Sequence, residues 1–113
     1  MSYADRADMR LVKDLTALAP VEAKGYFALS DAAERADGRI PPKYRELMSI
    51  AVALTTQCAY CLDVHTKRAL AAGASREEIA EAAFIASALR AGAAAAHGLL
   101  ALKLYDEHAA VAS

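Results

Sequence analysis

Two cysteines three residues apart are the side chains of this sequence best suited to chemistry. They are Cys58 and Cys61, within Cys58-Ala59-Tyr60-Cys61. At the start of a helix this spacing puts both sulfurs on one face, where a disulfide can form with little rearrangement. Helix amides and the helix dipole favour a thiolate there, and the thiolate is the form that attacks peroxides and disulfides. The pair therefore predicts a redox centre.

A histidine follows the cysteines at helical spacing. His65 lies four residues beyond Cys61 and seven beyond Cys58. At about 100° per residue, it is about 20° from Cys58 and about 40° from Cys61 around the helix axis, so the three side chains share one stripe. A neutral imidazole can accept a proton from a thiol, and an imidazolium stabilises a thiolate. His65 is therefore the candidate base.

A single carboxylate precedes the longest uncharged stretch of the chain, residues 47–62. Glu46 needs a partner there, because burying a lone carboxylate against an apolar surface is costly. If its helix neighbours the helix of the cysteines, His65 is the nearest partner in the sequence. Glu46 would then orient the imidazole and raise its basicity, as the third group does in nucleophile–base–orienter arrangements.

Three further polar side chains are weaker candidates for the site. Tyr60, between the cysteines, either donates a hydrogen bond into the site or simply packs its ring. His97 lies among alanines and is expected in packing or an interface, and His108 is expected to be solvated near the end of the chain. We include Tyr60 as a supporting residue and leave both histidines outside the site.

Helical patterns run through the whole chain, and no strand-like alternation appears. Gly73 suits the left-handed position that ends a helix, and Ser75 with Glu78 forms a capping box that starts the next. Gly92 and Gly98 mark either a kink or the close approach of another backbone. The predicted fold is all-α, with a single domain over residues 1–113. Its six helices are expected at residues 5–19, 20–36, 42–57, 59–72, 75–89 and 91–109.

The composition restricts partners and compartment. The 113 residues are 57% hydrophobic and 6% aromatic, with a formal net charge of −1. Interspersed charges without a basic stripe argue against nucleic acid and anionic membranes as partners. Residues 47–62 are too short and too polar to span a bilayer, and the first residues lack the order of a signal peptide. We therefore expect a cytoplasmic protein. In that compartment, paired cysteines are more often redox-active or metal-binding than part of a structural disulfide.

The chain is also unusually apolar for its length, with a mean hydropathy of +0.18. A small domain has too much surface to hide all its apolar residues by itself. Large exposed apolar patches usually mark an interface, so we expect a homo-oligomer.

Taken together, these residues resemble the alkylhydroperoxidase AhpD-like branch of the carboxymuconolactone decarboxylase superfamily. The resemblance rests on Glu46, eleven intervening residues, the Cys58-Ala59-Tyr60-Cys61 motif, three more residues and His65. It extends upstream through Ile40-Pro41-x-Lys43-x-Arg45 and downstream through Ala69-x-x-x-Gly73-Ala74-Ser75-x-Glu77-Glu78-Ile79. The motif core covers residues 40–89, and the combined spacing is far more specific than two cysteines alone.

The resemblance implies a helical fold that assembles as homotrimers or homohexamers, with the site near subunit interfaces. It implies reduction of hydroperoxides without a cofactor or metal. By that analogy Cys61 attacks the peroxide and becomes a sulfenic acid, and Cys58 resolves it to a disulfide. A thiol reductant protein or a small dithiol would then supply electrons to Cys58, and Glu46 with His65 would relay protons.

One departure from the family pattern keeps other functions open. The best-studied type has a second histidine where this chain has Tyr60, and a tyrosine with its ordinary pKa of about 10 is no base near neutral pH. One alternative is a thiol–disulfide reductase or redox sensor without peroxidase turnover. Another is a structural oligomeric module, or a zinc site made by Cys58, Cys61, His65 and Glu46, although these spacings do not match zinc fingers. A carboxymuconolactone decarboxylase-like lyase is the last, and the cysteine pair argues against it.

Overall fold

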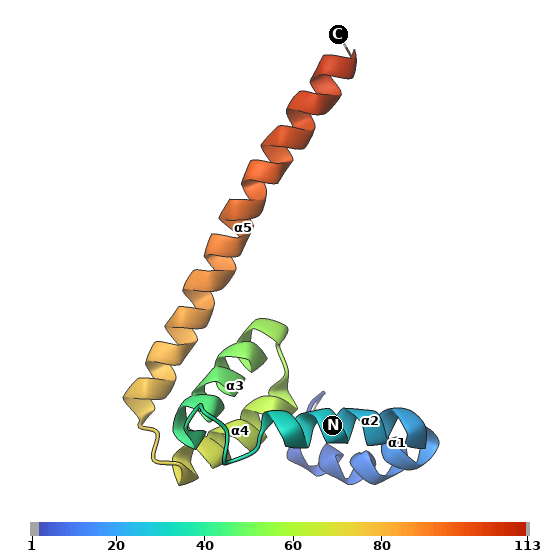
Figure 1. Ribbon diagram of the computed structural model, residues 1–113, viewed down its shortest axis with the longest axis vertical. Helices are drawn as coiled ribbons and strands as arrows, with labels where there is room; N and C mark the ends of the chain where they lie inside the picture. The colour runs from blue at the N-terminus through green and yellow to red at the C-terminus, as the bar shows by residue number, and fades with distance from the viewer. Residues whose placement is uncertain (1–2, 113) are drawn as a thin grey trace.

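The protein is a set of helices in which three pack together and the two ends extend away from them (Figure 1). The computed structural model describes residues 3–112, and that range contains no strand. The all-α prediction is therefore confirmed. The elements are the 3₁₀-helix η1 (Arg6–Leu11) and the α-helices α1 (Val12–Leu18), α2 (Pro20–Ala33), α3 (Pro42–Thr56), α4 (Ala59–Ala71) and α5 (Arg76–Ala112).

The core lies where α3 packs against both α4 and α5. Ile50, on α3, is only 1% exposed and meets Ala69 of α4 and Ala74 of the following turn. Alanine side chains let the helix backbones approach closely, and a surrounding layer of Leu47, Leu54, Leu62 and Ile79 is partly buried around them. Because α3 occupies the middle of this arrangement, it holds three buried residues, more than any other described helix.

Local signals set the turn between α4 and α5 as predicted. Gly73 has φ +90°, the left-handed conformation that ends α4 at low steric cost. Ser75 then caps α5: its hydroxyl accepts from the Glu78 amide at 3.1 Å, and the Glu78 carboxylate accepts from the Ser75 amide at 2.9 Å. Lys43 of α3 pairs with Glu78 at 2.9 Å, which ties the start of α5 to the core.

Several predicted boundaries differ from the structure, and α2, expected to reach residue 36, ends at Ala33. The helix expected over residues 5–19 consists of η1 followed by α1, and the helices expected over residues 75–89 and 91–109 form one continuous α5. A glycine inside a helix costs only about 1 kcal/mol relative to alanine, so Gly92 and Gly98 among alanines do not stop it. A methyl group added at either glycine would meet nothing within 4 Å, so no other part of the chain requires them.

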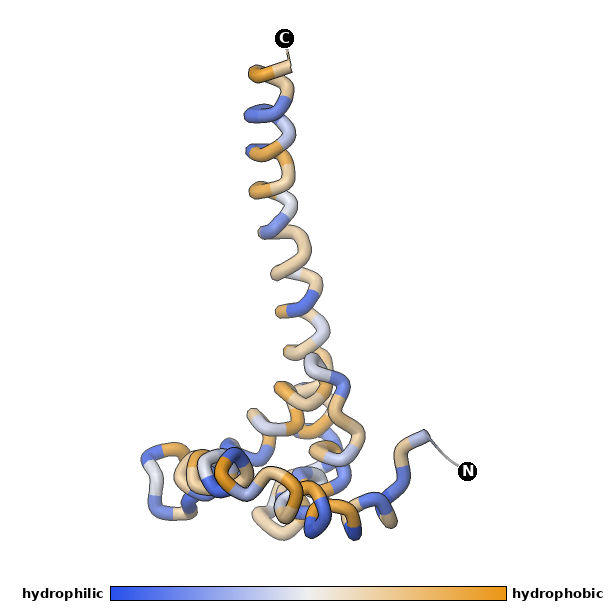
Figure 2. The backbone as a smooth tube through the Cα atoms, turned by 90° about the vertical axis from the view of Figure 1, so that its right-hand side faces the viewer, coloured by the Kyte–Doolittle hydropathy of each residue, from blue (hydrophilic) through white to orange (hydrophobic). Residues whose placement is uncertain are grey.

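Both ends of the chain lack a core of their own. The elements η1, α1 and α2 contain no buried residue. In α5, every described residue after Ala86 is exposed, and this part projects alone with apolar positions along it (Figure 2). By length and composition alone α5 could cross a membrane, a test that core helices of soluble proteins also pass.

The position of Ile50 at the centre of the core has a measurable consequence. Ile50→Ala should lower the free energy of unfolding by about 2–5 kcal/mol, because the neighbouring helices cannot close the cavity it leaves. Urea unfolding followed by circular dichroism at a fixed protein concentration measures the loss. The control Val52→Ala, at a side chain 60% exposed on the same helix, should cost less than about 1 kcal/mol. Equal losses in the two variants would contradict the packing described here.

Candidate redox site

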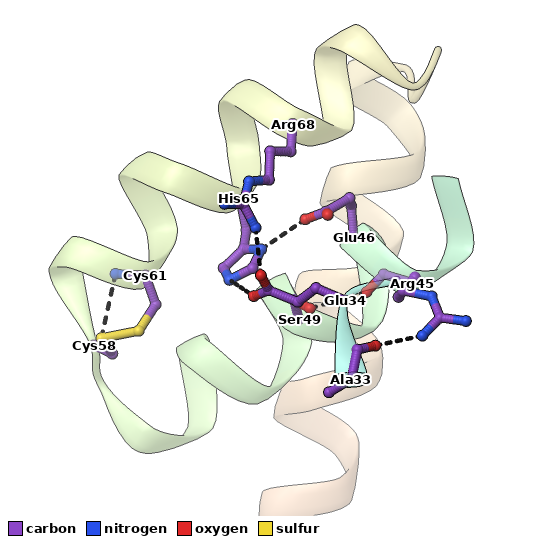
Figure 3. Close-up of polar contacts among 9 residues, drawn as sticks. All are labelled: Ala33, Glu34, Arg45, Glu46, Ser49, Cys58, Cys61, His65 and Arg68. Carbon is purple, nitrogen blue, oxygen red and sulfur yellow. Dashed lines mark hydrogen bonds and ion pairs between the residues drawn. A yellow bond between two sulfur atoms is a disulfide. The ribbon is translucent and has the colours of Figure 1, made fainter. Parts of the chain in front are cut away.

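The cysteine pair lies at the junction between α3 and α4 (Figure 3). α3 ends at Thr56 and is capped by Gln57, whose left-handed backbone (φ 58°, ψ 48°) turns the chain, and Cys58 takes the N-cap position of α4. The Cys58 Sγ accepts a hydrogen bond from the Cys61 amide at 3.2 Å. The two sulfurs are joined in a disulfide, with their Cα atoms 5.3 Å apart. The predicted placement of both sulfurs together at a helix start is confirmed.

The predicted contact between Glu46 and His65 is also confirmed. Glu46 comes from α3 and His65 from α4, and the Oε2 and Nδ1 atoms are 2.6 Å apart. Both side chains are nearly enclosed, at 11% and 13% exposure. Since an ionised carboxylate can only accept, Nδ1 carries the proton of this hydrogen bond. The bond fixes the plane of the ring and leaves Nε2 as the nitrogen available for proton transfer.

A second carboxylate, which sequence reasoning missed, faces that free nitrogen. Glu34 caps the C-terminal end of α2, and its Oε1 lies 3.6 Å from His65 Nε2. Its other oxygen accepts a hydrogen bond from Arg68 Nη1 at 2.8 Å. This bond raises the pKa of the Arg68 guanidinium. Arg68 could have been found from its position three residues after His65 on the same helix face, but no local signal connects Glu34 to the site.

The segment between α2 and α3 is held against the site by Arg45. The guanidinium of Arg45 donates to the carbonyl oxygen of Ala33 (Figure 3) and, at 3.2 Å, to that of Ile40. Gly38 makes room for this arrangement, because a side chain at that position would collide with the guanidinium. The end of α2, and with it Glu34, is thereby kept beside α3.

A cavity of about 410 Å³ opens beside the site. Cys61 and His65 both line it, whereas Cys58 is not among its lining residues. Much of the remaining wall is aliphatic and includes Ile40, Met48 and Val52. A small molecule whose apolar portion packs against this wall would therefore lie beside Cys61 and His65.

Tyr60 is bound to the N-terminal segment. Its hydroxyl donates to Asp8 Oδ2 of η1 at 2.6 Å, and its side chain is 40% exposed. This hydrogen bond raises the pKa of Tyr60 and lowers that of Asp8. Nearby, Arg6 pairs with Asp63 at 2.7 Å, so η1 has two polar contacts with the first turns of α4. The hydroxyl is thus directed toward η1, which neither sequence-based interpretation of Tyr60 anticipated.

The other sequence candidates lie outside this cluster. His97 and His108 are both exposed on the projecting part of α5, and His97 Nδ1 is 3.3 Å from the Ala93 carbonyl of its own helix. Among residues 3–112, no group of three or more His, Cys, Asp or Glu side chains has an arrangement suited to a metal ion. The four zinc ligands considered from the sequence therefore do not form such a set in this structure.

Comparison with known proteins gives the class to which this fold and site belong. Residues 20–104 match the carboxymuconolactone decarboxylase family, and the chain is a member of that family. The resemblance seen in the sequence is thus confirmed. A relative from Paracoccus denitrificans, described as uncharacterized protein 4 in the cox locus, is 38% identical over 107 residues, covering 89% of this chain and 96% of the relative. An uncharacterized protein from Cupriavidus necator is 34% identical over 70 residues, covering 62% of each.

Two crystal structures share the arrangement of helices. A protein from Methanobacterium thermoautotrophicum superimposes with a TM-score of 0.70 at 28% sequence identity, covering 80% of this chain and 97% of that one. A protein from Thermotoga maritima gives a TM-score of 0.66 at 31% identity, covering 74% of this chain and 72% of the other. The fold that holds the cysteine pair therefore recurs in archaeal and bacterial relatives.

The enclosed hydrogen bond between Glu46 and His65 should contribute to stability. Glu46→Ala should lower the free energy of unfolding by about 2–4 kcal/mol, because it leaves a cavity and removes the partner of a largely buried imidazole. The control Glu81→Ala, at an exposed position of α5, should change it by less than about 0.5 kcal/mol. Urea denaturation of both variants measures the difference, and a loss no larger in Glu46→Ala than in the control would contradict the contact.

Proposed function

We propose that this protein is a thiol peroxidase that reduces hydroperoxides through a Cys58–Cys61 disulfide cycle. The observation that carries the proposal is the shared cavity: Cys61 and His65 line one space, and Glu46 holds the imidazole from the other side. Membership of the carboxymuconolactone decarboxylase family, to which the AhpD-like peroxidases belong, supports the same conclusion.

The proposed cycle begins with the reduced pair. The His65 imidazole accepts the proton of the Cys61 thiol, and the thiolate attacks the terminal oxygen of the hydroperoxide. The O–O bond breaks, Cys61 becomes a sulfenic acid, and the departing alkoxide takes the proton from the imidazolium to leave as an alcohol. The Cys58 thiol then attacks the sulfenic sulfur, which forms the disulfide and releases water. An external dithiol reduces this disulfide, is itself oxidised, and restores both thiols.

The surroundings of each sulfur support this division of roles. Cys61 lines the cavity with its aliphatic wall, which suits an organic hydroperoxide whose alkyl portion packs against Met48 and Val52. Cys58, at the N-cap of α4, lies outside that lining and is left for the reductant. The cycle uses only cysteine chemistry and a thiol reductant, so the proposal includes neither a metal nor a cofactor.

The proton relay in this proposal is short. Tyr60 stands where the best-studied relatives have a second histidine, and its raised pKa keeps it protonated near neutral pH. Glu46 and His65 therefore form the whole relay between Cys61 and the leaving oxygen. This predicts slower turnover than in relatives with two histidines, without changing which sulfur reacts.

Substitution of the two cysteines tests the peroxidase directly. With cumene hydroperoxide and a dithiol donor, Cys61→Ser should reduce peroxide consumption to the rate without protein, because the attacking sulfur is lost. Cys58→Ser should still react once and leave a sulfenic acid that dimedone traps and mass spectrometry detects. His65→Gln should lower the rate about 100-fold or more, since the base is removed. Ser87→Ala, exposed on α5, is the control and should keep the full rate.

Two outcomes would contradict the peroxidase. Peroxide consumption that survives in both Cys58→Ser and Cys61→Ser would show that the disulfide cycle is not the route. Negligible peroxide consumption together with rapid exchange against protein disulfides would instead identify a thiol–disulfide reductase or redox sensor.

The same proposal includes assembly as a homotrimer or homohexamer. Its support is the exposed apolar surface at both ends of the chain, where η1, α1 and α2 have no buried residue and α5 is exposed beyond Ala86. Side chains such as Leu99 and Leu102 are 72% and 65% exposed in the single chain. A second copy can cover this surface in solution, which is why we favour an oligomer in the cytoplasm over a membrane helix.

Light scattering after gel filtration, without detergent, tests the assembly. The full chain should elute with the mass of three or six copies, and the double variant Leu99→Glu/Leu102→Glu should shift it to smaller species, because it places charges in the covered surface. Lys67→Glu, exposed on α4, is the control and should leave the mass unchanged. A monomeric wild-type mass, or a chain that stays in solution only with detergent, would overturn this part of the proposal.

A further inference from the structure

His65 lies between two carboxylates, and only one of them belongs to the relay proposed above. Glu46 binds Nδ1 at 2.6 Å, while Glu34 Oε1 stands 3.6 Å from Nε2 on the opposite side of the ring (Figure 3). The second separation is too long for a good hydrogen bond, so this pairing is electrostatic. At this distance Nε2 can still accept a proton from a thiol, and the Glu34 carboxylate then stabilises the protonated ring.

The carboxylate of Glu34 is held at this position by the tertiary structure. Arg68 binds its other oxygen at 2.8 Å, which prevents the side chain from turning away. Arg45 holds the backbone at Ala33, directly before Glu34, and at Ile40, at the end of the segment that follows it. The side chain of Glu34 is 29% exposed, so its interaction with the ring is only partly screened by water.

The charges around the ring balance only when His65 is protonated. Those that contact the ring or its partners are Glu46 from α3, Glu34 from α2 and Arg68 from α4. With a neutral imidazole these groups sum to −1, and with an imidazolium they sum to zero. Other charged groups near the site are engaged elsewhere: Arg45 binds backbone carbonyls, and Lys43 of α3 pairs with Glu78 of α5.

We infer that Glu34 is a positioning residue that stabilises the proton on His65 Nε2 and thereby keeps Cys61 as a thiolate. In the step concerned, the proton leaves the Cys61 sulfur and binds Nε2, and no other bond changes. Without Glu34 the imidazolium loses one of its two counter-charges, and the proton returns more readily to sulfur. The inference rests on the proposed function for its purpose in turnover, but the effect on the thiol exists whether or not a peroxide is reduced.

The test measures the reactivity of Cys61 against pH. In the Cys58→Ser background, with the single thiol reduced, the rate of alkylation by iodoacetamide is recorded from pH 5 to pH 9. Adding Glu34→Gln should move the pH of half-maximal rate upward by about 0.5–1 unit, because the thiolate then forms at higher pH. Glu34→Asp, which retains the charge on a shorter side chain, should restore part of the shift.

A matched control removes a carboxylate from an ion pair elsewhere. Asp63→Asn, on α4 and paired with Arg6, makes the same change in charge and should leave the alkylation midpoint in place. The ultraviolet absorbance of the thiolate in the same Cys58→Ser background provides a second measurement, and Glu34→Gln should lower it at neutral pH. No change in either measurement, or a change equal to that of Asp63→Asn, would overturn the inference.

Failure of this inference and failure of the proposed function give different results. If the wild-type protein consumes no peroxide but Glu34→Gln still moves the alkylation midpoint, the peroxidase is wrong and the positioning role stands. If the wild-type protein consumes peroxide and the midpoint does not move, Glu34 has no such role. Circular dichroism shows whether Glu34→Gln is folded. If it is not, Glu34→Asp provides the test, and a smaller upward shift of its alkylation midpoint supports the inference.

Discussion

The candidate site depends on one hydrogen bond between a carboxylate and an imidazole that are both nearly enclosed by protein. Glu46 would be costly to bury alone beside the apolar face of α3, and the Nδ1–H of His65 satisfies it at 2.6 Å. The bond also determines which nitrogen of the ring stays available and in which direction it points. Its geometry is set by the packing of α3 on α4, where Ile50 and Ala69 exclude water and let the two helices approach. The same packing of α3 on α4 therefore stabilises the core and orients the His65 imidazole.

The candidate site and the exposed apolar surface lie in different parts of the molecule. The polar network of Glu34, His65, Glu46 and Arg68 lies where the end of α2 meets α3 and α4, beside the packed centre of the chain. The N-terminal helices and the distal part of α5 contribute no buried residue. Since α2 carries Glu34 into the network and also belongs to the uncovered end, contacts that position α2 can reach the imidazole. The proposed assembly and the proposed redox chemistry would thus be linked through α2.

Much of this arrangement follows from short-range signals. The spacing of the cysteines and His65, the cap formed by Ser75 and Glu78, and the left-handed Gly73 depend on residues within one or two helical turns. Boundaries without such signals were less predictable. The continuation of α5 through Gly92 and Gly98 depends on an energy of about 1 kcal/mol per glycine, and no motif in the sequence marks the division between η1 and α1.

The sequence alone determined an all-α chain of this family, with a cysteine pair at a helix start and Glu46 and His65 as neighbours across two helices. These features are local, or follow from the need of a buried carboxylate for a partner. Only the tertiary structure decided that Glu34 and Arg68 complete the site and that the Tyr60 hydroxyl binds η1. Those contacts join residues that are far apart in the chain, and they form because packing brings the end of α2 and the segment η1 onto α4. Long-range contacts of this kind leave no periodicity or motif, so the chain has to be folded before they can be seen.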